Sequence, residues 1–263
     1  MSDEGHVLYS LVDGVARITL NRPERKNAVD APMWRSLAEV LATVKDDADA
    51  RVVVLSGAGG DFCAGADVGK SKHDEHPISR LRRIGDVALA LYELPMPVIA
   101  SVDGVAVGAG CNMALACDLV IASTRARFAE IFTRRGLSID FGGSWLLPRI
   151  VGMQQAKRLA LLADVIGAEE AYRLGMVTWL TPPEELDEFV SATAERIAKL
   201  PPVALTQTKR LLNEGVGTSL RDAIGNETAA QAVNLATEDA PAAFTAFLQK
   251  TEAPVYSGRW AVR

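Results

Sequence analysis

The spacing of hydrophobic positions changes along the chain. Near the N-terminus, apolar runs at 7–11 and 15–20 flank Asp13-Gly14, a dipeptide suited to a tight hairpin turn. Short continuous apolar runs then recur at 51–55, 97–102 and 119–122. Continuous runs are typical of strands covered on both faces, as in α/β sheets. The pattern predicts an antiparallel hairpin followed by the strands of a covered sheet.

Other segments have the three- and four-residue apolar spacing of amphipathic helices. The segment 31–44 is an example, with Asp30 placed to cap its first turn. Similar spacing is found at 78–92, 113–117, 153–163, 184–199, 202–213, 220–236 and 240–250. Strands that alternate with helices indicate βαβ crossovers. We therefore expect an α/β core at 1–200 and a helical C-terminal region at 201–263.

Composition narrows the class of protein. The chain has 263 residues, of which 49% are hydrophobic and 23% charged, as in soluble globular proteins. Its net charge of −5 argues against a nucleic-acid partner, which requires an excess of cations. We expect a cytoplasmic protein without a membrane segment, because the first residues lack signal-peptide features and no run of about 18 apolar residues occurs.

Two glycine-rich loops, 56–68 and 103–112, follow predicted strands. Ligands bind at the carboxyl ends of strands in α/β sheets, and glycine lets backbone N–H groups approach a ligand closely. The loops could therefore hold an oxyanion. Tight strand-to-helix turns also need glycine, so that simpler interpretation stays open. Neither loop has the P-loop pattern or fits the dinucleotide-binding pattern well.

Four segments resemble motifs of the crotonase, or enoyl-CoA hydratase/isomerase, superfamily, and they occur in the family's order. They are LNRPERKNA at 20–28, FCAGAD at 62–67, VDGVAVGAG at 102–110 and AEEAYRLGMV at 168–177. The resemblance implies an α/β fold with a repeated ββα spiral core. It also implies an acyl-CoA thioester enzyme that needs no metal and no cofactor besides the CoA of its substrate. The C-terminal helices would build a homotrimer or homohexamer.

By the same resemblance, the backbone N–H groups of Ala66 and Ala109 would form an oxyanion hole for the thioester. Two preorganised donors stabilise a developing enolate by about 3 to 4 kcal/mol each. The residues assigned to CoA or substrate binding are Arg25, Lys26, Ala64, Asp67, Val68, Phe132, Phe247 and Lys250. Two alternatives remain: Asp67 could fix its loop, and Lys250 could be a solvated partner of a helix end.

The chain departs from the family's hydratases at two positions. Those enzymes carry two glutamates that hold and activate water, and this sequence has Asn112 and Phe132 there. Neither an amide nor a phenyl ring is a general base at neutral pH, so ordinary hydration is disfavoured. Glu130 would replace the lost base only if the local register shifts.

Asp140 is the remaining acid/base candidate. Its surroundings, GLSIDFGGSWLLPRIVG at 136–152, resemble ring-1,2-epoxyphenylacetyl-CoA isomerases and some enoyl-CoA isomerases, in which the matching Asp moves a proton. The resemblance implies an enoyl-CoA isomerase in which Asp140 shuttles a proton between two carbons. Apolar neighbours, expected at Phe132, Phe141 and Trp145, would raise the pKa of Asp140.

Several alternatives stay open. Asp140 could cap a short helix that begins near Gly142, or attack an aromatic ring as in 4-chlorobenzoyl-CoA dehalogenases. The protein could be a hydratase that uses Glu130 or water bound to Asn112, or a non-catalytic acyl-CoA binder. We assign no chemistry to two further pairs of residues. His73 and His76 lack a third metal ligand nearby and are interpreted as part of a solvated loop, and Cys63 and Cys111 as packing residues.

Overall fold

The computed structural model describes residues 5–69 and 76–261, which form two β-sheets and ten α-helices. The larger sheet has the strand order β1-β2-β3-β4-β6-β9. Its strands are β1 Val7–Val12, β2 Val15–Leu20, β3 Val52–Gly57, β4 Val98–Val102, β6 Leu119–Ser123 and β9 Trp179–Thr181. Only β1 and β2 pair antiparallel in this sheet. The smaller sheet contains β5 Val105–Val107, β7 Arg127–Ala129 and β8 Ile166–Gly167.

The helices form three groups along the chain. Those that precede the C-terminal region are α1 Ala31–Asp46, α2 Pro77–Tyr92, α3 Ala109–Leu115, α4 Gly143–Val151, α5 Met153–Leu162, α6 Ala168–Arg173 and α7 Leu186–Ala198. The C-terminal arm consists of α8 Pro202–Gly215, α9 Leu220–Leu235 and α10 Asp239–Gln249. Short 3₁₀ turns are η1 Pro23–Arg25, η2 Ala58–Gly60, η3 Ile131–Arg135 and η4 Pro183–Glu185. No helix in the described ranges is long and apolar enough to cross a bilayer.

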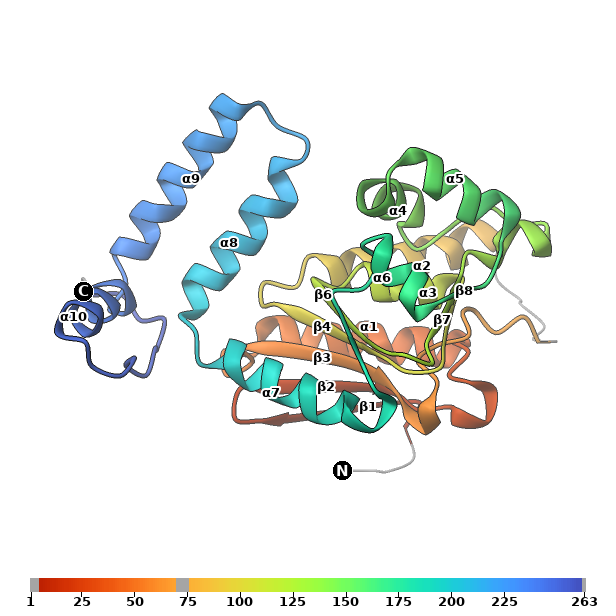
Figure 1. The fold of residues 1–263 in the computed structure, drawn as a ribbon, viewed down its shortest axis with the longest axis horizontal. Helices are drawn as coiled ribbons and strands as arrows, with labels where there is room; N and C mark the ends of the chain where they lie inside the picture. Colours follow the sequence, from red (N-terminus) through yellow and green to blue (C-terminus); the bar gives the residue numbers. More distant parts are fainter. Residues whose placement is uncertain (1–4, 70–75, 262–263) are drawn as a thin grey trace.

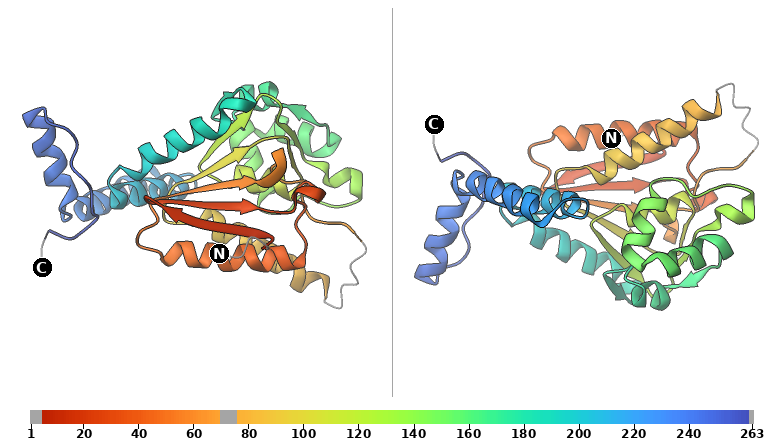
Figure 2. Two further views of the ribbon diagram at one scale, coloured as in Figure 1. Left: turned by 90° about the horizontal axis from the view of Figure 1, so that it is seen from below. Right: turned by 90° about the horizontal axis from the view of Figure 1, so that it is seen from above.

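The larger sheet is covered on both faces, as its continuous apolar strands predict. Val53 and Leu55 of β3 belong to the main core with α1 and α2, whereas Val52 and Val54 pack with α7. Figure 2 shows α1 and α7 on opposite faces of the sheet. Each fully buried Leu or Ile contributes about 1.5 to 3 kcal/mol, so the sheet is a rigid base for the loops at its strand ends.

The region between β4 and β6 differs from the sequence prediction. The expected turn at 104–110 contains strand β5, and the helix expected at 113–117 begins at Ala109. Glycine at position 110 obscured this helix in the sequence. It is required because a Cβ there would lie 2.3 Å from the Cys63 carbonyl oxygen. Close packing between the two loops, rather than helix propensity, therefore sets the start of α3.

The arm formed by α8–α10 projects away from the core (Figure 1). Lys209 of α8 anchors it: the Lys209 Nζ lies 2.7 Å from Asp118 Oδ2 and donates to the Met96 carbonyl oxygen at 3.1 Å. The division of the chain near residue 200 stays a prediction.

Candidate active site

The two glycine-rich loops lie side by side. Cys63 and Ala106 form a parallel β-bridge, in which Cys63 N donates to Val105 O at 2.8 Å and Val107 N donates to Cys63 O at 2.9 Å. Gly65, with φ of 92°, reaches the second loop so closely that a Cβ would lie 2.7 Å from the Val107 carbonyl oxygen. Pairing of segments distant in sequence thus brings the loops into contact.

The backbone N–H groups of Ala66 and Ala109 lie in these adjoining loops, and neither donates a hydrogen bond within the described residues. Ala109 is the first residue of α3, where N–H groups have no partner inside the helix. Val29 N donates to Gly65 O, and Val29 O accepts from Asp67 N. These two bonds leave the Ala66 N–H on the opposite edge of its extended segment. The arrangement leaves two amides free to bind an anionic oxygen.

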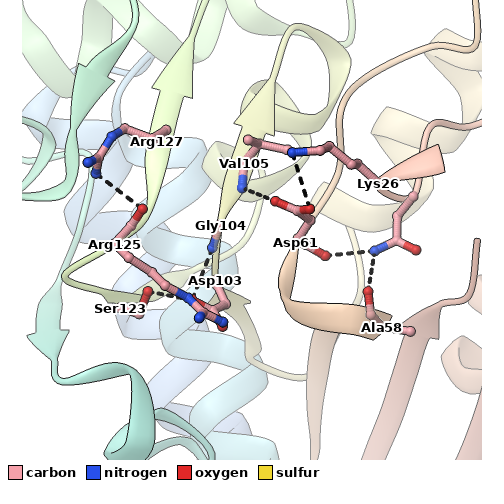
Figure 3. Close-up of polar contacts among 10 residues, drawn as sticks. Lys26, Ala58, Asp61, Asp103, Gly104, Val105, Ser123, Arg125 and Arg127 are labelled. Atoms are coloured by element: carbon pink, nitrogen blue, oxygen red, sulfur yellow. Dashed lines mark hydrogen bonds and ion pairs between the residues drawn. The ribbon is translucent and has the colours of Figure 1, made fainter. Parts of the chain in front are cut away.

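A polar network fixes the start of the second loop (Figure 3). Asp103 accepts hydrogen bonds from Ser123 Oγ at 2.6 Å, from Gly104 N at 3.0 Å and from the Arg125 guanidinium. Burial alone would raise the pKa of Asp103, but the bonds from Arg125 and Ser123 hold it below its ordinary value. Asp103 is therefore an anionic support for the loop.

The first loop is held by residues expected to bind CoA. Ala64 N donates to the Lys26 carbonyl oxygen at 2.9 Å, and Lys26 Nζ lies 3.6 Å from Asp61 Oδ2. Asp61 in turn accepts from Val105 N at 3.0 Å, which joins the two loops (Figure 3). The structure thus places Lys26 beside the first glycine-rich loop, to which Ala64 belongs, with the Lys26 side chain mostly exposed.

Asp67 shapes the end of the same loop. Its carboxylate accepts from Gly69 N at 2.9 Å and from Arg22 Nη2 at 3.1 Å. The Gly69 amide and Arg22 hold the pKa of Asp67 below its ordinary value against the effect of burial. The geometry supports the loop-fixing alternative for Asp67, while Arg25 and Val68 lie exposed nearby in the same region.

Phe247 and Lys250 do not join this group within one chain. Phe247 belongs to α10, Lys250 ends it, and the helix lies at the far end of the arm from both loops (Figure 1). The Phe247 side chain is 80% exposed. A role for either residue at these loops therefore requires a second copy of the chain.

Asp140 precedes α4, and its carboxyl does not cap that helix. The N-cap is Gly142, and it is the Asp140 carbonyl oxygen that accepts from Gly143 N at 3.0 Å. Oδ1 of Asp140 is buried and has no hydrogen-bond partner in the described residues. Burial raises the pKa of this carboxyl to about 6. The helix-capping interpretation of Asp140 is wrong, and its carboxyl is available for acid/base chemistry.

The three expected apolar neighbours have different surroundings. Phe132 is buried, and a Cβ on Gly108 would lie 3.6 Å from its ring, which places the ring beside the second loop. Phe141 is buried, with its ring centroid 5.7 Å from that of Trp34. Trp145 is 39% exposed and packs against Tyr92 and Arg149. Phe132 is thus a buried aromatic side chain that borders the second glycine-rich loop.

Glu130, to which sequence reasoning assigns only a conditional role, lies beside Asn112 and close enough to Asp140 for the charge of Asp140 to affect it. Its side chain is 2% exposed, and its Oε2 accepts from Asn112 Nδ2 at 3.3 Å. Burial, with a smaller contribution from the charge of Asp140, raises the pKa of Glu130 to about 7. The available signal was a single carboxyl inside the apolar run FAEIF at 128–132.

The remaining titratable candidates in the described residues are two buried cysteines and a histidine at the start of a helix. Burial raises the pKa of Cys63 to about 12 and that of Cys111 well above its usual value, which keeps both thiols protonated. His76 accepts from Ile78 N at 3.2 Å and so caps α2, and His73 lies outside the described residues. Within those residues, no three His, Cys, Asp or Glu side chains gather as a metal site would require.

Comparison with known proteins places nearly the whole chain in one family. A family model described as enoyl-CoA hydratase/isomerase matches residues 11–258. The 1,2-epoxyphenylacetyl-CoA isomerase of Escherichia coli strain K12 is 36% identical over 259 residues, covering 96% of this chain and 98% of that enzyme. The short-chain-enoyl-CoA hydratase of Clostridium acetobutylicum is 35% identical over 250 residues, covering 93% and 95%.

A solved structure agrees with these relatives. The enoyl-CoA hydratase/isomerase from Cupriavidus metallidurans CH34 has a TM-score of 0.90 and 36% identity, and the match covers 100% of both chains. The expected fold, an α/β crotonase core followed by C-terminal helices, is therefore confirmed. From the family model and the end-to-end matches we conclude that the chain belongs to the enoyl-CoA hydratase/isomerase, or crotonase, family.

Proposed function

We propose that the protein is an enoyl-CoA isomerase that moves a double bond in the acyl chain of a CoA thioester. The Asp140 carboxylate takes a proton from C2 of a 3-enoyl-CoA, and the released electron pair moves onto the thioester oxygen as a dienolate. The N–H groups of Ala66 and Ala109 bind that oxygen. Protonated Asp140 then returns the proton to C4, which leaves the double bond between C2 and C3.

The observation that carries this proposal is the partly buried Asp140 carboxyl, whose Oδ1 has no partner in the described part of the chain. Its pKa of about 6 lets one group both accept and donate a proton near neutral pH. The positions of the hydratase glutamates hold Asn112 and Phe132 instead. The identity to a 1,2-epoxyphenylacetyl-CoA isomerase adds support for isomerase chemistry.

The test uses trans-3-hexenoyl-CoA in deuterated water, with chromatographic separation of the two hexenoyl-CoA isomers and mass spectrometry of the deuterium in the product. Wild-type protein should form 2-hexenoyl-CoA, and Asp140→Asn should slow the reaction at least roughly 100-fold, the scale of general acid–base catalysis. Asp187→Asn, at an exposed position of α7, is the matched control and should leave the rate unchanged. Equal rates for Asp140→Asn and wild type would remove Asp140 from this role.

Hydratase activity is the second candidate, favoured by the buried Glu130 carboxyl beside Asn112 and by the hydratase names of several relatives. It requires Glu130 to activate a water molecule for addition across a 2-enoyl-CoA. Crotonyl-CoA would then yield 3-hydroxybutyryl-CoA, and Glu130→Gln would abolish the product. Acyl-CoA binding without turnover over a broad panel of thioesters would instead support a non-catalytic binder.

The proposal also includes how the CoA part of the substrate is bound and how the chains assemble. The exposed cations Arg25 and Lys26, beside the first loop, would meet the CoA phosphates. A homotrimer or homohexamer would let Phe247 and Lys250 reach the site of a neighbouring copy. The apolar residues left exposed on the arm, among them Leu212 and Leu220, support such an assembly.

A further inference from the structure

The Asn112 side chain connects Glu130 to the backbone of Asp140. Asn112 is fully buried on α3, and its Nδ2 donates to Glu130 Oε2 at 3.3 Å and to the Asp140 carbonyl oxygen at 3.0 Å. A side-chain amide has two N–H hydrogens, so these two bonds use its whole donor capacity. The amide therefore holds one orientation only while both acceptors are present.

Tight packing fixes where this amide lies. A Cβ at Gly143 would lie 2.3 to 2.5 Å from the Nδ2, Oδ1 and Cγ atoms of Asn112. The start of α4 is thus pressed directly against the amide, and only glycine allows that approach. Asn112 cannot turn away from Asp140 unless α4 also moves.

The backbone that follows Asp140 is strained and needs such support. Phe141 has φ of 50°, a conformation that costs a bulky residue free energy and persists only where its surroundings enforce it. The Phe141 ring packs against Trp34. The only side-chain hydrogen bond to the Asp140 main chain in the described residues comes from Asn112.

We propose that Glu130 is a positioning residue for the acid/base Asp140. Its carboxyl orients the Asn112 amide, which in turn holds the Asp140 backbone so that the Asp140 carboxyl keeps its place near the oxyanion loops. This inference rests on the proposed function only in naming Asp140 as the acid/base. The titratable groups that act on Glu130 are Cys111, whose thiol hydrogen-bonds it, and Asp140.

The test compares two substitutions of Glu130. Glu130→Gln keeps an oxygen that can accept the Asn112 bond, whereas Glu130→Leu removes the acceptor at similar volume. With trans-3-hexenoyl-CoA, Glu130→Leu should lower kcat about tenfold or more and leave KM nearly unchanged, the result of a misplaced catalytic group. Glu130→Gln should retain most of the wild-type kcat. A Gln variant as slow as the Leu variant would overturn the positioning role.

A second readout separates this inference from the proposed function. The Asp140 carboxyl can be titrated by NMR in protein labelled with ¹³C-aspartate, with the signal assigned through Asp140→Asn. Glu130→Leu should lower the pKa of Asp140 toward its ordinary value, because the released segment admits water, and Glu130→Gln should not. An unchanged Asp140 titration in Glu130→Leu overturns the inference even if no isomerase activity is found. Absent isomerase activity with the expected titrations overturns only the proposed function.

A third variant covers the case in which Glu130→Leu does not fold. Gly143→Ala pushes the Asn112 amide away from the start of α4 and should lower kcat and the pKa of Asp140 in the same direction. Gly85→Ala is the matched control, because a Cβ there meets nothing within 4 Å. Wild-type kcat and Asp140 titration in Gly143→Ala would count against the inference.

Discussion

At the residue scale, the protonation state of Asp140 decides the pH range of the proposed isomerisation. Burial raises the pKa of this carboxyl to about 6, and only the ionised form can take a proton from C2. We expect kcat to be nearly constant above about pH 7 and to fall roughly tenfold per pH unit well below the pKa. The measurement is kcat for trans-3-hexenoyl-CoA across this range. A rate that does not change across it would contradict the assignment.

Glu130 should make the free energy of unfolding depend on pH. Its pKa is about 7 in the folded chain and 4.5 ordinarily. Below about pH 4.5 both states hold the proton and the stabilisation is complete. As the pH rises toward 7 the unfolded state loses its proton first, so the folded state loses stability, on the order of 3 kcal/mol in total.

Glu130→Gln removes this titration. Relative to wild type, the variant should therefore be more stable at pH 8 than at pH 5, as measured by urea unfolding at both values. Glu188→Gln, at an exposed position of α7, should show no such difference between the two pH values. A constant difference between Glu130→Gln and wild type would show that Glu130 ionises normally.

At the element scale, the ion pair between Lys209 and Asp118 attaches α8 to the core. The Lys209 side chain is 9% exposed and that of Asp118 is 24% exposed, so removing the lysine leaves a carboxyl in a poorly solvated place. Lys209→Met should lower the free energy of unfolding by about 3 kcal/mol, as expected when one partner of a buried pair is lost. Thermal unfolding measures the effect, and Lys199→Met, at an exposed position, is the control. Equal melting temperatures for the two variants would show that the pair contributes little.

The sequence predicts the longer elements, because their hydrophobic spacing follows from packing against a large buried surface. The hairpin of β1 and β2 and the helix α1 agree with the expected ranges to within a few residues. The short elements α6 and β7–β9 could not be predicted, because tertiary contacts rather than periodicity hold them in place. The same limit applies to Glu130, because its neighbour Asn112 belongs to a different element and the contact depends on the fold.

Only the family resemblance, and no pattern in the sequence itself, predicts that Ala66 and Ala109 lie close together. In the structure it depends on the β-bridge between Cys63 and Ala106, and nothing in either loop alone specifies that pairing. Hydrophobic periodicity predicts the strands that the two loops follow. The pairing of one loop with the other depends on how the chain packs in three dimensions. The chemistry of the site therefore could not be derived from periodicity or composition.

At the scale of the whole molecule, the arm leaves apolar residues uncovered. The largest exposed ones include Leu212, Val216, Leu220, Ile224, Phe244, Phe247 and Leu248. Exposed apolar surfaces of this kind are typical of interaction sites, and we propose a second copy of the chain as the occupant, because it would also bring Lys250 to the site. We expect wild-type protein to be trimeric or hexameric by light scattering, and Leu212→Asp combined with Leu220→Asp to dissociate it.

The position of α10 lets this assembly be tested through substrate binding. Lys250 ends α10, and Figure 1 shows α10 far from α3, which begins at Ala109, so the proposed contact of Lys250 with CoA would be made at the site of a neighbouring copy. Lys250→Ala should therefore raise KM about tenfold, the effect of one charge-assisted hydrogen bond, and leave kcat unchanged. The dissociated variant should show at least the same rise, and adding Lys250→Ala to it should have no further effect, because the contact is already lost. Lys157→Ala, an exposed lysine of α5, is the control. A wild-type KM in Lys250→Ala, or additive effects in the combined variant, would mean that Lys250 does not act across the interface.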